Sequence, residues 1–179
     1  MTTGVRMTVH DYLALPEAKP YREYVCGEVI EKSMPNEEHG ILVQEIAACF
    51  ARWMHLAGGK AGPEIRVRFD TERGPEYRLP DYSYWSSGRP RRDGKDSLPP
   101  TLAVEVKSPD EPLEQLRSKC RYMRRYGVDV CWLIDPGRRV VEVFETERDG
   151  QPVAVGALRS KALGDLEIDV PALFAALDD

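Results

Sequence analysis

The sequence predicts a single α/β domain over residues 1–179, with a mixed central β-sheet flanked by helices. Two runs rich in β-forming residues, 77–85 and 102–107, are separated by a polar loop. A helical pattern over 109–126 lies between the second of these runs and the apolar run 128–134. This strand–helix–strand order predicts a parallel pair of strands joined by a right-handed crossover.

The overall composition is that of a globular protein. At 179 residues, of which 42% are hydrophobic, the chain is long enough to bury a core as one domain. No run approaches the roughly 18 apolar residues that a membrane span requires. The first ten residues lack the apolar segment of a secretion signal, so we expect a cytoplasmic protein without membrane association. The net charge of −5 counts against an abundant, non-specific nucleic-acid binder, but it does not exclude local basic patches.

The N-terminal region predicts a short helix followed by a hairpin. Thr8 is a good cap for a helix over 8–15. Residues 23–25 and 28–31 are strand-like and flank the dipeptide 26–27, Cys-Gly. A two-residue loop of this kind predicts a tight β-hairpin, although Cys-Gly is a weaker turn signal than Asn-Gly.

A long amphipathic helix is predicted next. Asn36 is its expected cap, acidic residues follow in the first turn, and the glycine pair 58–59 ends the pattern at about residue 56. Apolar residues at helical spacing form the expected buried stripe, which consists of Leu42, Ile46, Cys49, Trp53 and Leu56.

The middle of the chain predicts three strands. Residues 65–69 alternate as a half-exposed strand, and Gly74 with Pro75 marks a turn. We expect one strand over 77–85, a loop over 86–100, and a further strand over 102–107.

The remaining elements are a helix, two strands and a terminal helix. The helix over 109–126 has an apolar stripe of Leu113, Leu116, Cys120 and Met123. Lys119 falls beside this stripe on a helical wheel. The run 128–134 is almost entirely apolar, as expected for a central strand, and 140–144 is its predicted hairpin partner. A short helix over 171–177 follows.

Three charged residues interrupt the strand-like runs. Asp81 follows Pro80, and Glu105 and Lys107 fall on the same face of the strand 102–107, because side chains alternate along a strand. Two carboxylates from neighbouring strands could hold a divalent cation, and the lysine could orient a water molecule beside a phosphate.

The order Pro80-Asp81 followed by Glu105-Val106-Lys107 has the form PD-(D/E)xK and resembles the restriction-endonuclease-like nuclease superfamily. More narrowly, the whole chain resembles the Uma-two family of endonucleases in that superfamily. The segments that carry this resemblance are 7–13, 24–31, 38–40, 80–81, 104–109 and 132–136.

The resemblance implies a nuclease that hydrolyses phosphodiester bonds in DNA with Mg²⁺, for which Mn²⁺ could substitute. Asp81, Glu105 and the carbonyl of Val106 would bind the metal, and Lys107 would assist the attacking water. In many relatives the lysine is instead supplied by the following helix, so Lys119 is the reserve candidate. A homodimer is plausible, because cutting both strands needs two sites.

Other residues admit two interpretations. Glu28 matches a glutamate of the family and is either a further catalytic residue or metal ligand, or an exposed hairpin charge. His39, in the first turn of the long helix, is more simply a cap or surface histidine than a general base. The arginines of the second helix, Arg117, Arg121, Arg124 and Arg125, are more simply a solvated face than phosphate contacts.

Two other functions remain open at this point. One is a non-catalytic binding or regulatory module that keeps the nuclease fold, since the chain is acidic and shows no dedicated DNA-reading motif. The other is an acid–base hydrolase that uses two carboxylates alone, but such an enzyme would not need Lys107.

Overall fold

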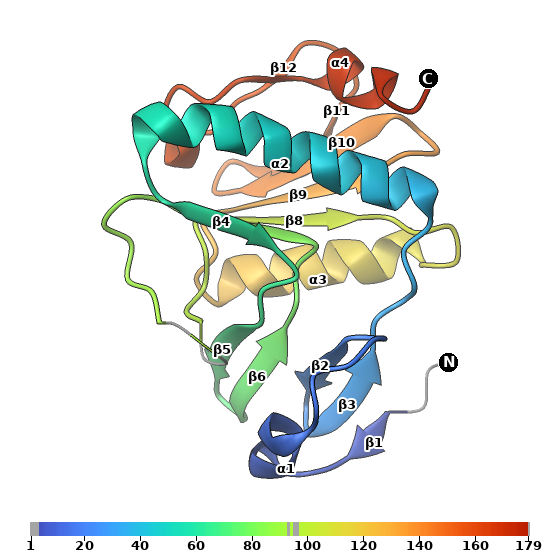
Figure 1. The fold of residues 1–179 in the computed structure, drawn as a ribbon, viewed down its shortest axis with the longest axis vertical. Helices are drawn as coiled ribbons and strands as arrows, with labels where there is room; N and C mark the ends of the chain where they lie inside the picture. The colour runs from blue at the N-terminus through green and yellow to red at the C-terminus, as the bar shows by residue number, and fades with distance from the viewer. Residues whose placement is uncertain (1–3, 93, 95–96, 179) are drawn as a thin grey trace.

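The computed structural model describes residues 4–92, 94 and 97–178. Their strands form a six-stranded sheet, a five-stranded sheet and a two-stranded ribbon (Figure 1). In spatial order, the six-stranded sheet consists of β11 (Arg148–Val153), β10 (Val140–Glu145), β9 (Val130–Asp135), β8 (Leu102–Val106), β7 (Tyr82–Trp85) and β4 (Lys60–Pro63). The five-stranded sheet consists of β1 (Val5–Arg6), β3 (Glu28–Glu31), β2 (Arg22–Val25), β6 (Gly74–Arg78) and β5 (Val67–Thr71). The ribbon pairs β12 (Ala157–Leu158) with β13 (Ile168–Asp169).

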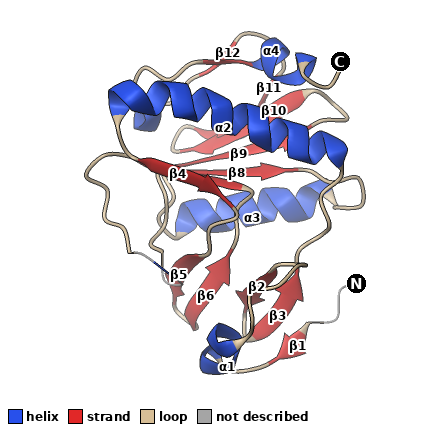
Figure 2. Ribbon diagram, in the orientation of Figure 1, coloured by secondary structure: helices blue, strands red, loops and turns tan. Residues whose placement is uncertain are grey.

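The helices divide the molecule into layers (Figures 1 and 2). They are α1 (Val9–Ala14), α2 (Glu37–Ala57), α3 (Leu113–Arg125), the 3₁₀ turn η2 (Lys161–Leu163) and α4 (Val170–Ala175). Helix α2 and the C-terminal segment cover one face of the six-stranded sheet, and α3 covers the other. The five-stranded sheet lies beyond α3, with α1 packed against it. Strands β8 and β9 are parallel and α3 connects them, which confirms the predicted crossover unit.

Helix α2 buries a slightly different stripe from the predicted one. Leu42, Ile46 and Phe50 are fully buried against the sheet, whereas Leu56 is 93% exposed. At 3.6 residues per turn, Phe50 lies only about 40° around the helix from Ile46, but Leu56 lies about 80° away. The stripe is therefore centred closer to Phe50 than the sequence pattern indicated.

The predicted strand 77–85 is wrong, because the chain leaves one sheet and enters the other within it. Strand β6 ends at Arg78 in the five-stranded sheet, and β7 begins at Tyr82 in the six-stranded sheet. Pro80 lacks the N–H that a continuous ladder would need. The carbonyl and N–H of Leu79 bond to side chains instead, the ammonium of Lys32 at 2.7 Å and a Glu23 carboxylate oxygen at 2.9 Å.

Two further boundaries differ from expectation. Gly74 and Pro75 begin β6, and the turn before them is made by Glu72 and Arg73. Helix α3 begins at Leu113 instead of near residue 109, because a residue that precedes proline, here the one before Pro112, is disfavoured in the helical conformation.

The predicted hairpin at Cys26 and Gly27 is confirmed. Both residues have positive φ angles, 51° and 82°, as a two-residue loop between twisted strands requires. Among the described residues, no helix is both long and apolar enough to cross a membrane.

We predict that Phe50→Ala lowers the free energy of unfolding by about 3–5 kcal/mol, because it leaves a cavity among Trp53, Tyr82, Tyr84 and Trp132. Leu56→Ala on the same helix is the control and should change it by no more than about 0.5 kcal/mol. Denaturant unfolding followed by circular dichroism measures both values. Equal losses in the two variants would contradict this assignment of the buried face.

Candidate active site

Asp81 lies at the point where the chain enters the six-stranded sheet, and its side chain is buried. Its Oδ2 accepts a hydrogen bond of 2.7 Å from the backbone N–H of Val106, at the end of β8. The same oxygen lies 3.1 Å from Nε2 of His39, and Oδ1 lies 2.7 Å from Nζ of Lys32. The carboxylate is thus fixed beside the end of the strand that carries Glu105.

Glu105 lies on β8 and is 2% exposed. Lys119 reaches it from the buried side of α3, with its Nζ 3.0 Å from Oε2 and 2.9 Å from Oε1. Among the described residues only the contact to Oε2 has the geometry of a hydrogen bond, so Oε1 faces the ammonium but accepts no hydrogen bond. An oxygen of this kind can accept a further ligand.

A third carboxylate, Glu23 on β2, completes the cluster. Its Oε1 lies 2.8 Å from Nζ of Lys119 and accepts the N–H of Leu79, while Oε2 accepts a 3.3 Å hydrogen bond from Arg78. Lys119 therefore lies between Glu23 and Glu105, which come from different sheets. No sequence pattern singled out Glu23, because its burial depends on how the five-stranded sheet packs on α3.

The cluster pairs buried carboxylates with cations. The carboxylates of Glu23, Asp81 and Glu105 face Lys32, Arg78 and Lys119, His39 adjoins them, and Arg78 also lies 3.7 Å from the buried carboxylate of Glu76. Buried charges persist only when they are paired in this way, because removing them from water is expensive.

Burial and the neighbouring charges together give the three carboxyl groups different pKa values. Burial alone would raise the pKa of Glu23, but Lys119 and Arg78 more than offset it and lower the pKa to about 2. Burial acts in the same direction on Asp81, yet Lys32 and His39 hold its pKa below the usual range. For Glu105 burial dominates over the attraction of Lys119, and the repulsion of Asp81 adds to it, so the pKa rises to about 7.

The structure brings Asp81, Val106 and Glu105 together but does not bring Lys107 to them. Lys107 follows the last residue of β8, and its ammonium is directed to the segment after the strand. Its Nζ instead binds the carbonyl oxygens of Ser108, at 3.1 Å, and Pro109, at 3.4 Å. Lys119, the reserve candidate, contacts Glu105 in its place.

Glu28 lies at the hairpin end of β3, away from the end that leads to Lys32. Its side chain is 38% exposed and its Oε1 lies 3.2 Å from Nε of Arg6. The expectation of a cap or surface role for His39 is wrong, because the residue is buried and contacts Asp81. Burial lowers the pKa of His39, but the hydrogen bond to Asp81 and the charge of that carboxylate outweigh this effect and raise the pKa.

The arginines of α3 are paired within the protein. Arg117 donates two hydrogen bonds, of 2.7 and 2.6 Å, to the buried carboxylate of Glu142. Arg121 bonds to Asp149 at 2.9 Å and Arg125 to Glu72 at 3.1 Å. These pairs account for the basic face of the helix without a phosphate ligand.

The donor chemistry of the cluster suits a hard divalent cation, because carboxylate oxygens are the protein ligands that Mg²⁺ prefers. The unsatisfied Oε1 of Glu105 is the one open position in the contacts just described. Both oxygens of Asp81 are engaged, so Lys32 would have to release Oδ1 to a metal. Among the described residues, no group of three or more His, Cys, Asp or Glu side chains is arranged to hold a metal ion by itself.

The comparisons with known proteins agree with this fold. The family model Uma2, described as "Putative restriction endonuclease", matches residues 9–177. A crystal structure described as a putative nuclease belonging to DUF820 from Anabaena variabilis superimposes with a TM-score of 0.82 at 24% identity. The match covers 96% of this chain and 99% of the other. At that identity the likeness shows the fold, and it confirms the predicted α/β architecture. No curated protein matches the chain.

We predict that Lys119→Met lowers the free energy of unfolding by about 3–5 kcal/mol, since it leaves Glu23 and Glu105 buried without their shared cation. Lys107→Met, the matched lysine control, should cost about 1 kcal/mol or less, because Lys107 contacts only two carbonyl oxygens. Urea unfolding at pH 7 with EDTA measures both. A larger loss in the Lys107 variant would contradict the pairing described above.

The raised pKa of Glu105 predicts a pH-dependent difference in stability. Between pH 4.5 and about 7 the unfolded chain releases the Glu105 proton while the folded protein retains it, so stability from this group falls as pH rises. Glu105→Gln cannot titrate. In EDTA, the unfolding free energy of this variant relative to wild type should therefore increase across that interval. Parallel pH profiles for the two proteins would refute the assignment.

Proposed function

The chain belongs to the Uma2 family, and from this premise we propose that it is a Mg²⁺-dependent endonuclease that hydrolyses phosphodiester bonds in DNA in the cytoplasm. The observation that supports the proposal is the convergence of two buried carboxylates at one end of β8. Asp81 accepts the N–H of Val106, and Glu105 precedes that residue by one position. The two acidic residues of the PD-(D/E)xK pattern, Asp81 and Glu105, therefore lie at the same end of β8.

Asp81, Glu105 and the carbonyl oxygen of Val106 would hold the cation, for which Mn²⁺ is a suitable substitute. When bound, such an ion lowers the pKa of a coordinated water and neutralises charge on the scissile phosphate. The carboxylates supply hard oxygen ligands, and Oε1 of Glu105, which faces the Lys119 ammonium, accepts no hydrogen bond from the part of the chain that the structure describes.

In the proposed reaction Lys119 takes the part that the sequence pattern gives to Lys107. Its ammonium is held by Glu105 and Glu23, so it can donate a hydrogen bond to the attacking water or a phosphate oxygen. Glu23 fixes this ammonium in place and is a positioning residue. Lys32 holds Asp81 and would move to the phosphate when the carboxylate binds metal.

One observation favours a second candidate, a non-catalytic module that retains the nuclease fold. Asp81 already has a full set of partners in Lys32, His39 and the N–H of Val106, as expected of a purely structural ion-pair cluster. Metal binding separates the two functions. The structural module needs no divalent ion, whereas the nuclease must bind one through Asp81.

We predict that the protein nicks supercoiled plasmid with Mg²⁺ or Mn²⁺. Asp81→Asn and Glu105→Gln should each lower the rate about 100-fold or more, the scale expected when one preorganised charged group is lost. Glu28→Gln removes a carboxylate that also matches the family but lies outside the cluster, and it should cleave at nearly the wild-type rate. Gel electrophoresis of timed samples measures the rates.

Calorimetric titration with Mn²⁺ provides the readout that does not depend on turnover. Wild type and Glu28→Gln should bind the ion, and Asp81→Asn should not. Equal cleavage by wild type and Glu105→Gln would reject the nuclease proposal and point to a contaminant. Absence of both cleavage and Mn²⁺ binding in the wild type would favour the non-catalytic module.

A further inference from the structure

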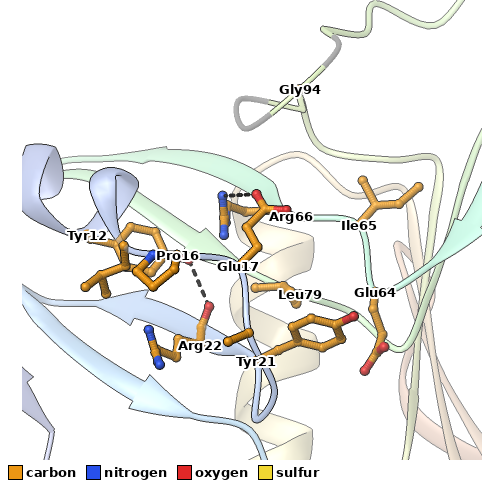
Figure 3. A pocket seen from close by; sticks show the side chains of 12 residues that line it. Tyr12, Pro16, Glu17, Tyr21, Arg22, Glu64, Ile65, Arg66, Leu79 and Gly94 are labelled. Atoms are coloured by element: carbon orange, nitrogen blue, oxygen red, sulfur yellow. Dashed lines mark hydrogen bonds and ion pairs between the residues drawn. The ribbon is translucent and has the colours of Figure 1, made fainter.

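A pocket lies next to the candidate active site, between the segment that follows α1 and the segment that leads into β5 (Figure 3). Its volume is about 240 Å³. Apolar side chains and two aromatic rings form part of its lining, namely Tyr12, Leu15, Pro16, Tyr21, Ile65 and Leu79. It is distinct from the carboxylate cluster, because none of Asp81, Glu105, Glu23 and Lys119 lines it.

The guanidinium of Arg66 is the buried cation of this pocket, which Arg22, Glu17 and Glu64 also line. Nε of Arg66 is buried and forms no hydrogen bond with the described residues, and Nη1 reaches the exposed carboxylate of Glu17 at 3.5 Å. The guanidinium lies 5.3 Å from the ring centre of Tyr12, which supports it from one side. Since guanidinium has five N–H donors, Arg66 retains donors for a ligand.

The pocket adjoins the active site through the backbone. Leu79 lines the pocket, while its carbonyl and N–H are held by Lys32 and Glu23 of the cluster. Glu64, also in the lining, donates its backbone N–H to the carbonyl of Asp81 at 3.3 Å. A second, smaller hollow contains Lys32 and shares Tyr21 and Glu64 with the pocket. Tyr21 and Glu64, which line both hollows, therefore lie between the pocket and the Lys32 ammonium that binds Asp81.

We propose that this pocket binds an unpaired nucleobase of the strand whose phosphate reaches Asp81 and Lys32. The inference rests on the proposed function and names its substrate class, a single-stranded or locally unpaired nucleic acid. A nucleotide carries its anionic phosphate and its flat base a short distance apart, which matches a hollow that contains Lys32 beside a pocket that offers both aromatic rings and polar groups.

Size and chemistry both favour a single base. Pockets for drug-sized ligands measure roughly 300–1,000 Å³, so a volume of about 240 Å³ suits one ring system and excludes a base pair. An aromatic ring such as that of Tyr21 offers a stacking surface that every base can use. Carbonyl oxygens and ring nitrogens on base edges are acceptors for a guanidinium such as that of Arg66.

The test measures binding in EDTA, where cleavage does not occur. Fluorescence anisotropy compares a labelled eight-nucleotide DNA single strand, the same strand with abasic central positions, and the matched duplex. Wild type should bind the intact single strand roughly fivefold or more tightly than the abasic strand, the scale of losing one stacked base. The duplex should bind more weakly than the intact single strand.

Two variants alter the pocket. Ala18→Trp fills it from an exposed rim position without removing a core contact, and Arg66→Met removes the donors while keeping an unbranched side chain over Tyr12. Both should abolish the preference for the intact strand. Ala51→Trp, the same change at an exposed position of α2, should retain it. Thermal unfolding verifies that each variant is folded.

The outcomes separate this inference from the nuclease proposal. Equal affinity of wild type for intact and abasic strands, or an unchanged preference in Ala18→Trp, overturns the base pocket even when the protein cleaves DNA. A base preference that depends on Ala18 and Arg66, without plasmid cleavage, supports the pocket and overturns the nuclease. No binding of any strand in EDTA overturns the base pocket, whereas plasmid cleavage with Mg²⁺ decides the nuclease proposal separately.

Discussion

The ammonium of Lys119, shared by Glu23 and Glu105, is the interaction on which the arrangement of the site depends. Glu23 comes from the five-stranded sheet, Glu105 from the six-stranded sheet, and Lys119 from the helix between them. Each carboxylate is buried and would be expensive to keep ionised alone. Because Lys119 pairs with a carboxylate from each sheet, both sheets must pack close to α3. This packing determines where Glu23 and Glu105 meet.

The two carboxylates that the sequence predicted are close together for a reason that the sequence did not contain. Asp81 was expected at the end of an uninterrupted strand, but it lies where the chain crosses from one sheet to the other. The crossing is held by Leu79, whose backbone groups cannot join a ladder and bond to Lys32 and Glu23 instead. A break of this kind depends on side chains about fifty residues away in sequence, so no local pattern reveals it.

Periodicity predicted the elements and failed where an element ended. The hairpin, the two long helices and the parallel crossover all follow from local pattern, and Leu42, Ile46, Leu116 and Met123 are buried as expected. Alternation also predicted that Glu105 and Lys107 share one face of the strand. It could not show that β8 ends at Val106 and that the Lys107 ammonium bonds to the carbonyls of the segment that follows. Identifying Lys119 instead requires knowing which face of α3 meets which strand, a tertiary property.

The charge balance of the cluster bears on how a proposed metal would enter. Lys32, Arg78 and Lys119 already pair with the carboxylates of the metal-free site, and Lys32 holds the Asp81 oxygen that a metal would take. A divalent cation bound at Asp81 would face the Lys32 ammonium in a buried place, which is unfavourable. A phosphodiester that arrives with the metal supplies one negative charge and an acceptor for the displaced Lys32. The metal and the nucleic acid should therefore each bind more tightly when the other is present. Until then, the ion pair of Lys32 with Asp81 holds the carboxylate in position.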